Sequence, residues 1–385
     1  MTGHDNEPVI VDALRTAVGR RNGALAEQHA ADLLGKVLAA LVERNGLPRE
    51  RIDDVVAGCA TQVGEQAGNV ARTALLMADF PVTVPGMTVQ RACGSSQQAV
   101  HIAHNLIATG TCDVVLAGGV ELMSRTAGAN DDTRYGRRHP PELVERFSMP
   151  SMGIAAERIA AHWDLSRESL DALALRSHQL AAQASDAGYF DGQILSVDLP
   201  DGRLFTRDEG IRYDTSAERL ASLKAAFQEG GRVTAGNASQ VSDGAAALLL
   251  MSRAAAALSG LKPRARVVAQ RVVGVAPDLM LTGPIPATQQ ILARAGLTVD
   301  DIDLFEINEA FASVLGAWLA ETRVPLERVN VCGGAIAIGH PLGSSGARLF
   351  TIVLNELERR RGRYALVSMC CGGGLGTATI IERLD

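Results

Sequence analysis

The 385-residue sequence is poor in aromatic residues and contains no apolar run long enough to cross a membrane. Aromatic residues make up only 4% of it, whereas glycine occurs 39 times, which is typical of an α/β fold with many tight turns. The apolar stretch Ala245–Met251 is far too short for a transmembrane helix. The first ten residues carry acidic side chains where a signal peptide has basic ones and an apolar run. These absences predict a cytoplasmic protein that does not contact membranes.

The cysteines and the charge also lack the patterns of several protein classes. The six cysteines are at positions 59, 93, 112, 332, 370 and 371. Because they form no C-x-x-C pair and no cysteine–histidine spacing that suits zinc, we expect reduced thiols and no metal site. The formal net charge is −6, which argues against a nucleic-acid-binding surface but leaves room for a local basic patch that holds a phosphorylated ligand.

Helix and strand patterns alternate over the first 119 residues. Apolar residues recur at the helical period over 31–46 and 70–78, and the apolar runs Asp54–Gly58 and Asp113–Gly119 have the length of buried strands. This alternation favours an α/β fold with a largely parallel sheet that helices cover.

The chain is long enough for two or three domains. The alternation breaks where a basic loop at 134–141, a helix at 166–187 and a loop-rich stretch at 192–213 follow one another. It resumes after a returning strand at 243–250. We predict an N-terminal half of 1–119 and 240–262, an inserted loop domain of 120–239, and a C-terminal half of 263–385.

The second half resembles the first. Residues 46–52 match residues 296–302, and Gly94-Ser-Ser matches Gly343-Ser-Ser, all at an offset of about 250 residues. Each Gly-Ser-Ser opens an apolar helix. Two similar α/β halves would bring the loops at these two motifs into one shared region.

Cys93 lies at the predicted start of the first of these helices. In residues 89–100, V-Q-R-A-C-G-S-S-Q-Q-A-V, an apolar run gives way to small polar residues, and the helical period then continues toward Gly110. The positive end of a helix dipole and free backbone N–H groups favour the thiolate, which is the form that attacks acyl carbons. Taken alone, such a cysteine is more often a small core residue.

Three further residues could complete a site. His340 lies in a glycine-rich loop, N-V-C-G-G-A-I-A-I-G-H-P-L-G-S-S-G, and glycines there allow a ligand to approach the backbone closely. Cys370 ends the predicted strand 364–369, whereas its neighbour Cys371 should point to the opposite face. Asn308 follows the strand 304–307, where it could also serve simply as an N-cap.

Together these motifs resemble those of the thiolases, acetyl-CoA acyltransferases, over essentially the whole chain. The matching stretches are C-G-S at 93, T-A-G-N-A-S at 234, N-E-A-F at 308, G-G-A-I-A-I-G-H-P-L-G at 333 and C-C-G-G-G at 370. The resemblance implies duplicated α/β halves with covered mixed sheets, plus an inserted loop domain.

The resemblance also implies a role for each group. Cys93 would be the nucleophile that accepts the acyl group, and His340 would activate it and donate to the thioester oxygen. Cys370 would be the acid/base, and Asn308 would hold a water in the first oxyanion hole. The backbone N–H groups of Cys93 and Gly372 would form the second oxyanion hole, since a tetrahedral intermediate needs donors fixed on its oxygen.

By the same resemblance the inserted domain would hold coenzyme A, which is a substrate, so that no cofactor is expected. The residues implied in binding substrate are Ser239, Arg212, Met152, Ala310 and Phe311. Three arginines of the insertion suit the phosphates of coenzyme A, although they could equally be solvated or contact another subunit; they are Arg134, Arg137 and Arg138. We expect the acyl pocket near 123–130, 149–152, Met280 and Phe311, and a homodimer or homotetramer.

The chain departs from the family pattern without losing a catalytic group. Ser151 precedes Met152 where many acetoacetyl-CoA-forming members have histidine, and Cys332 and Ser242 stand where asparagine is frequent. The position after Ser95 lacks the more usual glycine. With thiolysis the favoured direction of the reaction, these features favour degradation of a 3-ketoacyl-CoA. The alternatives are acetoacetyl-CoA synthesis, a ketosynthase-type condensing enzyme, and a scaffold that only binds acyl-CoA.

Overall fold

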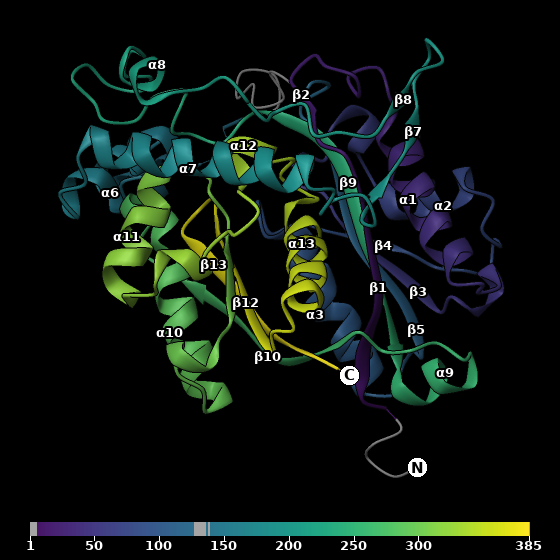
Figure 1. The fold of residues 1–385 in the computed structure, drawn as a ribbon. Coiled ribbons are helices and arrows are strands. Elements are labelled where there is room, and N and C mark those ends of the chain that lie inside the picture. Colours follow the sequence, from purple (N-terminus) through teal and green to yellow (C-terminus); the bar gives the residue numbers. More distant parts are fainter. Residues whose placement is uncertain (1–5, 127–135, 138, 385) are drawn as a thin grey trace.

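A mixed sheet of eleven strands runs through the computed structural model, which describes residues 6–126, 136–137 and 139–384 (Figure 1). The strand order is β11-β12-β13-β10-β1-β9-β5-β3-β4, with β2 on β9 and β6 on β1. The strands of the first half are β1 (Pro8–Thr16), β2 (Gly19–Arg20), β3 (Asp54–Gly58), β4 (Met87–Val89), β5 (Val114–Leu122) and β9 (Ser242–Ser252). Those of the second half are β10 (Ala265–Gly274), β11 (Leu304–Ile307), β12 (Tyr364–Cys371) and β13 (Leu375–Arg383).

The order of strands shows the duplication directly. Moving outward from the central pair β1–β10, the first half continues β9-β5-β3 and the second half continues β13-β12-β11. The predicted strands at 54–58 and 304–307 are confirmed as β3 and β11, which occupy equivalent places in the two halves.

The expectation of a largely parallel sheet is wrong. The pairs β3–β5 and β11–β12 are parallel, but β1–β10, β1–β9, β5–β9, β10–β13 and β12–β13 are antiparallel. β13 follows β12 after a turn of three glycines, too short for the crossover that a parallel pair requires. β9 returns beside β5 only after the long segment that separates them, so its direction could not be read from local pattern.

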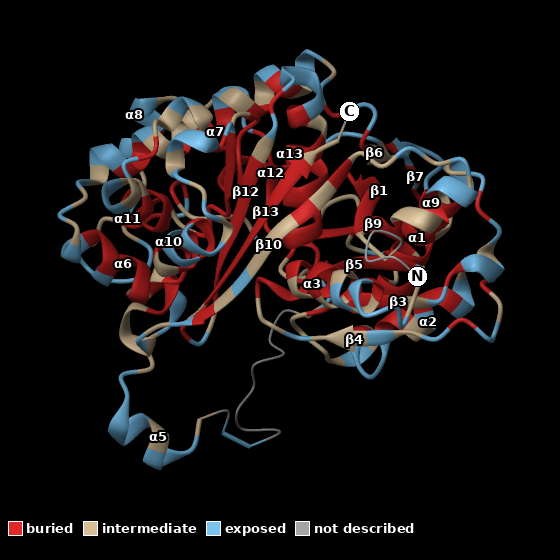
Figure 2. Ribbon diagram, turned by 90° about the horizontal axis from the view of Figure 1, so that it is seen from below, coloured by how far each residue is buried: buried red, intermediate tan, exposed pale blue. Residues whose placement is uncertain are grey.

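Helices lie in layers on both faces of the sheet (Figure 1). Two of them, α3 (Ser95–Ala108) and α13 (Ser345–Arg360), pack against each other between the two halves, and their apolar residues share one buried cluster. The outer faces are covered by α1 (Ala30–Arg44) and α2 (Val70–Met77) in the first half, and by α10 (Pro284–Ala295) and α11 (Ala312–Thr322) in the second. Figure 2 shows the buried residues concentrated along these central strands and helices.

The segment between β5 and β9 is built mainly of helices. Helix α7 (Arg167–Asp186), predicted over 166–187, packs on α11 and on α12 (Ala335–Ile338). The other elements of this segment are α5 (Pro141–Arg146), α6 (Met152–His162), α8 (Ala217–Ala221), β6 (Ile194–Leu195), β7 (Val197–Asp198) and β8 (Leu204–Phe205), and α9 (Arg253–Leu258) follows β9. The division into two halves and an inserted domain stays a prediction. In the described part of the chain no helix is long and apolar enough to cross a membrane.

The start of α13 meets α3, and the loop just before α13 meets β5, so closely that only glycine fits at both contacts. A Cβ on Gly343 would lie 2.4 Å from the carbonyl oxygen of Val120, and a Cβ on Gly346 would lie 2.4 Å from the backbone nitrogen of Gln97. Side chains of ordinary size at these positions would push the halves apart. The predicted approach of the two Gly-Ser-Ser motifs is therefore confirmed, with the glycines as its physical cause.

We expect Gly343→Ala to lower the free energy of unfolding by about 1–3 kcal/mol or more, because the added methyl group meets backbone atoms that cannot rotate away. Gly192→Ala is the matched control, since a Cβ there meets nothing within 4 Å, and its effect should stay within about 0.5 kcal/mol. Thermal and urea denaturation of both variants measure this. Equal stability of the two variants would show that the contact between the halves is not tight.

Candidate active site

A cavity of about 660 Å³ opens beside the start of α3 and contains two of the predicted groups, Cys93 and Gly372. Its wall is made by loops from both halves and by residues just before and at the start of α6. The residues that line it are Ala60, Thr61, Gln90, Ala92, Cys93, His139, Met149, Pro150, Ser151, Met152, Met280, Leu342, Gly372 and Gly373.

Cys93 sits in a sharp turn between β4 and α3. Its predecessor Ala92 has a φ of +46°, a left-handed conformation that is strained for a residue with a side chain, and such strain is common at functional sites. Helix α3 begins at Ser95 with Gly94 as its N-cap, so Cys93 precedes the helix rather than lying in its first turn. Only 3% of Cys93 is exposed, at the floor of the cavity.

Cys93 is a thiol at neutral pH, contrary to the expectation of a thiolate. Burial raises the pKa of Cys93 to about 11, although the backbone N–H groups of Gly372 and of Cys93 itself pull it down. The charge of Glu121 adds to the upward shift. The loss of water around the sulfur therefore outweighs the stabilisation of the thiolate by these two N–H groups. A base is needed to form the nucleophile, and the same two N–H groups point at the place where negative charge would develop.

Hydrogen bonds fix both the backbone and the ring of His340. Its backbone N–H donates to the Ser242 hydroxyl at 3.1 Å, and its ring Nδ1 is 2.7 Å from the Ser345 hydroxyl. The Ser345 hydroxyl donates to the carbonyl of Pro341 at 2.8 Å, which leaves its oxygen to accept from Nδ1–H. Nε2 then carries the lone pair, which accepts a hydrogen bond from Nδ2 of Asn308 at 3.2 Å. These hydrogen bonds fix the orientation and the tautomer of the imidazole, and Ser242, at the position where asparagine is frequent in the family, accepts from the His340 backbone.

Burial also keeps His340 uncharged. It lowers the pKa of the ring to about 3, and the nearby charge of Arg348 acts in the same direction. The ring is therefore neutral throughout the physiological range, and burial opposes its protonation just as it opposes ionisation of Cys93.

Asn308 is not an N-cap, because α11 begins at Ala312 with Phe311 as its N-cap. Its backbone N–H donates to Ser368 on the neighbouring strand β12, and its side chain turns toward His340. The buried Oδ1 of Asn308 has no hydrogen-bond partner in the protein. Buried polar atoms of this kind are usually satisfied by a bound water, so the geometry fits the water that the resemblance implies.

Cys370 and Cys371 are both fully buried at the end of β12. Cys370 packs in the same apolar cluster as Met280, whereas the sulfur of Cys371 lies 2.7 Å from where a Cβ on Gly94 would be. The two side chains thus point to different sides, as a strand requires. Burial raises the pKa of each thiol, and the proximity of Cys93 raises it further.

Sequence reasoning missed Glu121, which holds the loops around the cavity. This fully buried carboxylate accepts hydrogen bonds from the backbone N–H groups of Ala60 at 2.8 Å, Thr61 at 3.0 Å and Gly343 at 2.9 Å. The available signal was an isolated acid at the end of the apolar strand V-V-L-A-G-G-V-E-L. A buried charge needs such partners, so this pattern alone indicates a structural anchor.

The residues expected to bind coenzyme A do not all meet at the cavity. Met152 lines it, and Ser239 donates its backbone N–H to the carbonyl of Ala310 at 2.9 Å, which places the loop 234–239 beside Phe311. Arg212 is exposed and does not line the cavity. Arg137 is exposed as well, while Arg134 and Arg138 lie outside the described residues.

The acyl pocket expected near Met149–Met152 and Met280 coincides with this cavity, but Met123 and Phe311 do not line it. Residues 127–130 lie outside the described residues. The prediction missed Thr61, Gln90, His139 and Leu342. Of these only Leu342 had a signal, because it directly follows the His340-Pro motif.

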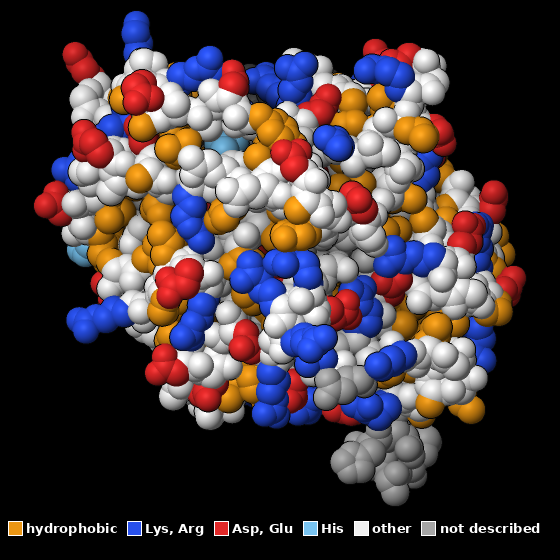
Figure 3. Space-filling view, in the orientation of Figure 1, with side chains coloured by type: hydrophobic (Ala, Val, Ile, Leu, Met, Phe, Trp, Pro, Cys, Tyr) orange, Lys and Arg blue, Asp and Glu red, His pale blue; other side chains and the backbone are white. Residues whose placement is uncertain are grey.

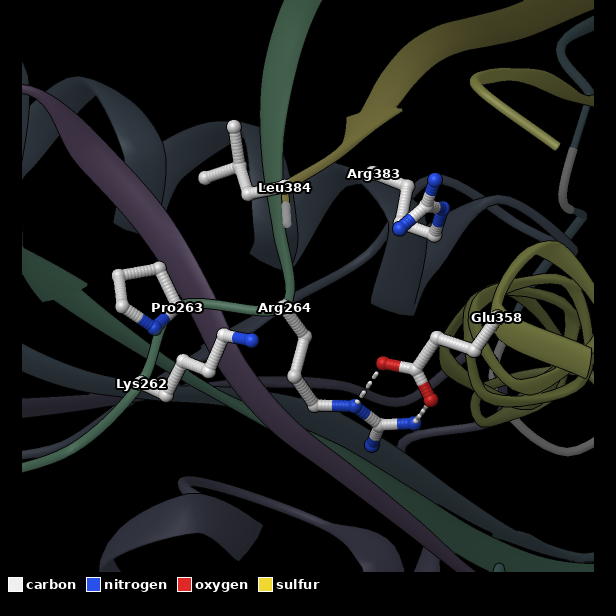
Figure 4. A pocket seen from close by; sticks show the side chains of 6 residues that line it. All are labelled: Lys262, Pro263, Arg264, Glu358, Arg383 and Leu384. Atoms are coloured by element: carbon white, nitrogen blue, oxygen red, sulfur yellow. Dashed lines mark hydrogen bonds and ion pairs between the residues drawn. The ribbon is translucent and has the colours of Figure 1, made fainter. Parts of the chain in front are cut away.

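A second hollow, of about 410 Å³, lies far from these groups between the linker at 262–264 and α13 (Figure 4). Its Arg264 donates to both carboxylate oxygens of Glu358, at 2.7 and 2.6 Å, and to Asp12 at 3.0 Å. Lys262 and Arg383 also line the hollow, so three cations and one carboxylate border it, and none of the predicted catalytic groups lies there.

Neither the charges on the surface in Figure 3 nor the described side chains indicate another binding or metal site. Figure 3 shows basic and acidic side chains interspersed over one face, without a broad basic area. Within 6–126, 136–137 and 139–384, no group of three histidine, cysteine or acidic side chains could hold a metal ion.

The chain is similar to known proteins over its whole length. Residues 8–254 match the family model for the thiolase N-terminal domain, and residues 261–383 match that for the thiolase C-terminal domain. A steroid 3-ketoacyl-CoA thiolase of Mycobacterium tuberculosis is 46% identical, covering 98% of this chain and 94% of the relative. A 3-oxoadipyl-CoA/3-oxo-5,6-dehydrosuberyl-CoA thiolase of Escherichia coli is 45% identical, covering 98% and 100%.

The fold agrees with the sequence comparison. The crystal structure of the Bacillus anthracis acetyl-CoA acetyltransferase matches with a TM-score of 0.92 and 41% identity, covering 100% of both chains. Both halves of the molecule are therefore accounted for by one family, in sequence and in fold. The chain belongs to the thiolase family.

Proposed function

We propose that this acyltransferase cleaves a 3-ketoacyl-CoA with coenzyme A to give an acyl-CoA and acetyl-CoA, with Cys93 carrying the acyl group. His340 Nε2 takes the thiol proton, and the sulfur of Cys93 bonds to the C3 carbonyl carbon. The C2–C3 bond then breaks, its electrons pass to acetyl-CoA as an enolate, and Cys370 protonates that carbon. The Cys370 thiolate then takes the proton of the coenzyme A thiol, whose sulfur attacks the acyl-Cys93 thioester. The acyl group leaves as acyl-CoA, and the sulfur of Cys93 regains its proton from His340 Nε2.

One observation carries this proposal: the buried thiol of Cys93 lies in the cavity between two backbone N–H groups that lower its pKa, those of Gly372 and Cys93. An oxyanion formed at that place would be stabilised by donors already fixed, each worth roughly 3 kcal/mol of barrier. The Cys93 and Gly372 N–H groups would form the second oxyanion hole, and the His340–Asn308 pair, with its buried unpartnered oxygen, supports the first, which is made with a bound water.

The degradative direction is supported by the pocket. Ser151 lines it and caps α6 by accepting from the backbone of Ile154, so this position offers a small hydroxyl rather than an imidazole. The family match favours this enzyme interpretation over a ketosynthase or a non-catalytic scaffold. Acyl-CoA and coenzyme A are the substrates, and the enzyme needs no cofactor.

Coenzyme A is proposed to lie over the segment between β5 and β9, along Met152 and the loop of Ser239, with Arg212 toward its nucleotide end. Met152 Sδ lies 4.0 Å from where a Cβ on Gly372 would be, which places this wall beside the oxyanion site. The exposure of Arg212 suits a residue that meets phosphate in solvent.

A homodimer or homotetramer in the cytoplasm is proposed. Within the described residues no strand pairs with the outer side of the edge strand β4, and apolar side chains on it and nearby are exposed; they are Leu76, Met77, Val82 and Met87. Such an edge is normally covered by a partner. The six free cysteines fit a reducing compartment.

Incubation with acetyl-CoA, followed by digestion and mass spectrometry, should place an acetyl group on the peptide that contains Cys93. Cys93→Ala should abolish both the label and turnover, because no other group carries the acyl chain. A folded protein without label at Cys93 contradicts the mechanism.

Cys370→Ala should still accept acetyl from acetyl-CoA to a measurable extent, yet lose carbon–carbon bond formation and thiolysis by several orders of magnitude, on the order of 10²–10⁴-fold or more. Cys371→Ala is the control and should cost at most ~1 kcal/mol of stability with little loss of activity. Single-turnover acylation and steady-state thiolysis separate the two steps. An essential Cys371 would reverse the assignment of the acid/base.

Ser345→Ala should slow acylation of Cys93 by about tenfold to a hundredfold, less than the ~10²–10⁴-fold that a general base contributes, because Nδ1–H of His340 loses its acceptor. The neighbouring Ser344→Ala is the control, since that hydroxyl contacts only Pro341.

The acylation rate of the wild-type enzyme should show no loss near pH 6.5, because the imidazole ring of His340 stays neutral down to about pH 3. A protonation step near pH 6.5 that belongs to His340 would contradict its role as a buried neutral base.

A further inference from the structure

The cavity at Cys93 has an apolar wall beyond the oxyanion site. Three methionines and a leucine contribute to it, namely Met149, Met152, Met280 and Leu342. Met280 is the most buried of the methionines, with 5% exposure, and Met152 is the most open, with 44%. Met152 lies beside Gly372, and all four side chains line the same cavity as the Cys93 sulfur, so they border the space that an acyl group on Cys93 can enter.

No aspartate, glutamate, lysine or arginine is among the described residues that line this cavity. The polar groups that do line it are uncharged hydroxyls and an amide, together with His139. A carboxylate brought into such a place would lose water without meeting a lysine or arginine among these lining residues, which is unfavourable. The described wall therefore discriminates against an acyl group that ends in a charge.

The volume of the cavity argues against a small acyl group as the only substrate. At about 660 Å³ it equals roughly 20 water volumes, at ~30 Å³ each, and it must hold the inner end of the pantetheine arm as well as the acyl group. An acetoacetyl group would leave much of the methionine wall in contact with water. Methionine side chains have three rotatable bonds, so they adapt to branched or ring-shaped groups better than branched aliphatic residues do.

We propose that the preferred substrate is a 3-ketoacyl-CoA whose acyl group is uncharged, apolar and larger than acetoacetyl, and that Met149, Met152, Met280 and Leu342 select it. This inference rests on the thiolysis mechanism proposed above and narrows its substrate class. The preferred substrate would then differ from the one in the name of the Escherichia coli relative, which specifies 3-oxoadipyl-CoA.

Two comparisons of substrates test the proposal. 3-Oxohexanoyl-CoA and 3-oxoadipyl-CoA have acyl groups of the same number of carbons and differ in a terminal methyl group against a carboxylate. We expect kcat/KM for thiolysis to be at least about tenfold higher for the uncharged member. We also expect kcat/KM to rise from acetoacetyl-CoA through 3-oxohexanoyl-CoA to 3-oxodecanoyl-CoA. One methylene group in an apolar pocket changes kcat/KM by about 10–200-fold at most. A 3-oxoadipyl-CoA value equal to or above its partner, or an optimum at acetoacetyl-CoA, overturns the proposal.

A variant tests whether the wall itself sets this preference. Met149→Lys places a cation at a half-buried position and keeps the aliphatic length of methionine. The variant should shift the ratio of the two kcat/KM values toward 3-oxoadipyl-CoA by about tenfold or more. Met149→Gln is the uncharged control and should not improve the charged substrate. Leu258→Lys adds the same charge at a residue that is 86% exposed and outside the cavity, and should leave the ratio unchanged. An equal shift in all three variants contradicts the proposal.

Failure of this substrate proposal can be distinguished from failure of the proposed thiolase mechanism. If the enzyme is not a thiolase, no 3-ketoacyl-CoA turns over and Cys93 is not labelled by any of them. If only the substrate class is wrong, Cys93 is labelled and the ranking of substrates differs. Should Met149→Lys not fold, the substrate panel on the unchanged enzyme still decides.

Discussion

The carboxylate of Glu121 is the interaction on which the geometry of the site depends. It stands at the end of β5, fully buried, and accepts hydrogen bonds from the first half at Ala60 and Thr61 and from the second half at Gly343. Ala60, Thr61 and Leu342, which directly precedes Gly343, all line the cavity. One charged group thus fixes both walls, and a buried charge that lost these donors would be strongly unfavourable.

Glu309 plays a similar part on the other side of the reactive groups. It directly follows Asn308 and accepts from the hydroxyl of Ser177 at 2.6 Å, from Nδ2 of Asn330 at 2.9 Å and from the backbone of Ile336 at 3.2 Å. These donors come from α7, from the loop after β11 and α11, and from α12. The two carboxylates carry the hydrogen bonds that hold the loops, so that Cys93 and the Oδ1 of Asn308 need not be tied up in structural bonds.

The sequence predicts local elements better than their pairing, and the reason is physical. The helix expected over 31–46 is α1 at Ala30–Arg44, since its period depends on one buried face only. The direction of β9 depends on a contact with β5 across more than a hundred residues, which no local pattern contains. The motifs located Cys93 and His340, but the pKa of each depends on burial by distant segments, and the dipole argument for a thiolate failed for that reason.

Burial gives the proposed mechanism its starting state. Cys93 has a pKa of about 11 and His340 a pKa of about 3, so both are uncharged at neutral pH and no ion pair has to be kept from water before substrate binds. Charge first appears when the thiol proton moves to Nε2 and the carbonyl oxygen becomes negative. At that moment the N–H groups of Gly372 and Cys93, held in place by the fold, stabilise the negative charge more strongly than they stabilise the uncharged resting enzyme. Stabilisation is thereby reserved for the transition state, which is the condition for raising the rate rather than only tightening the binding of substrate.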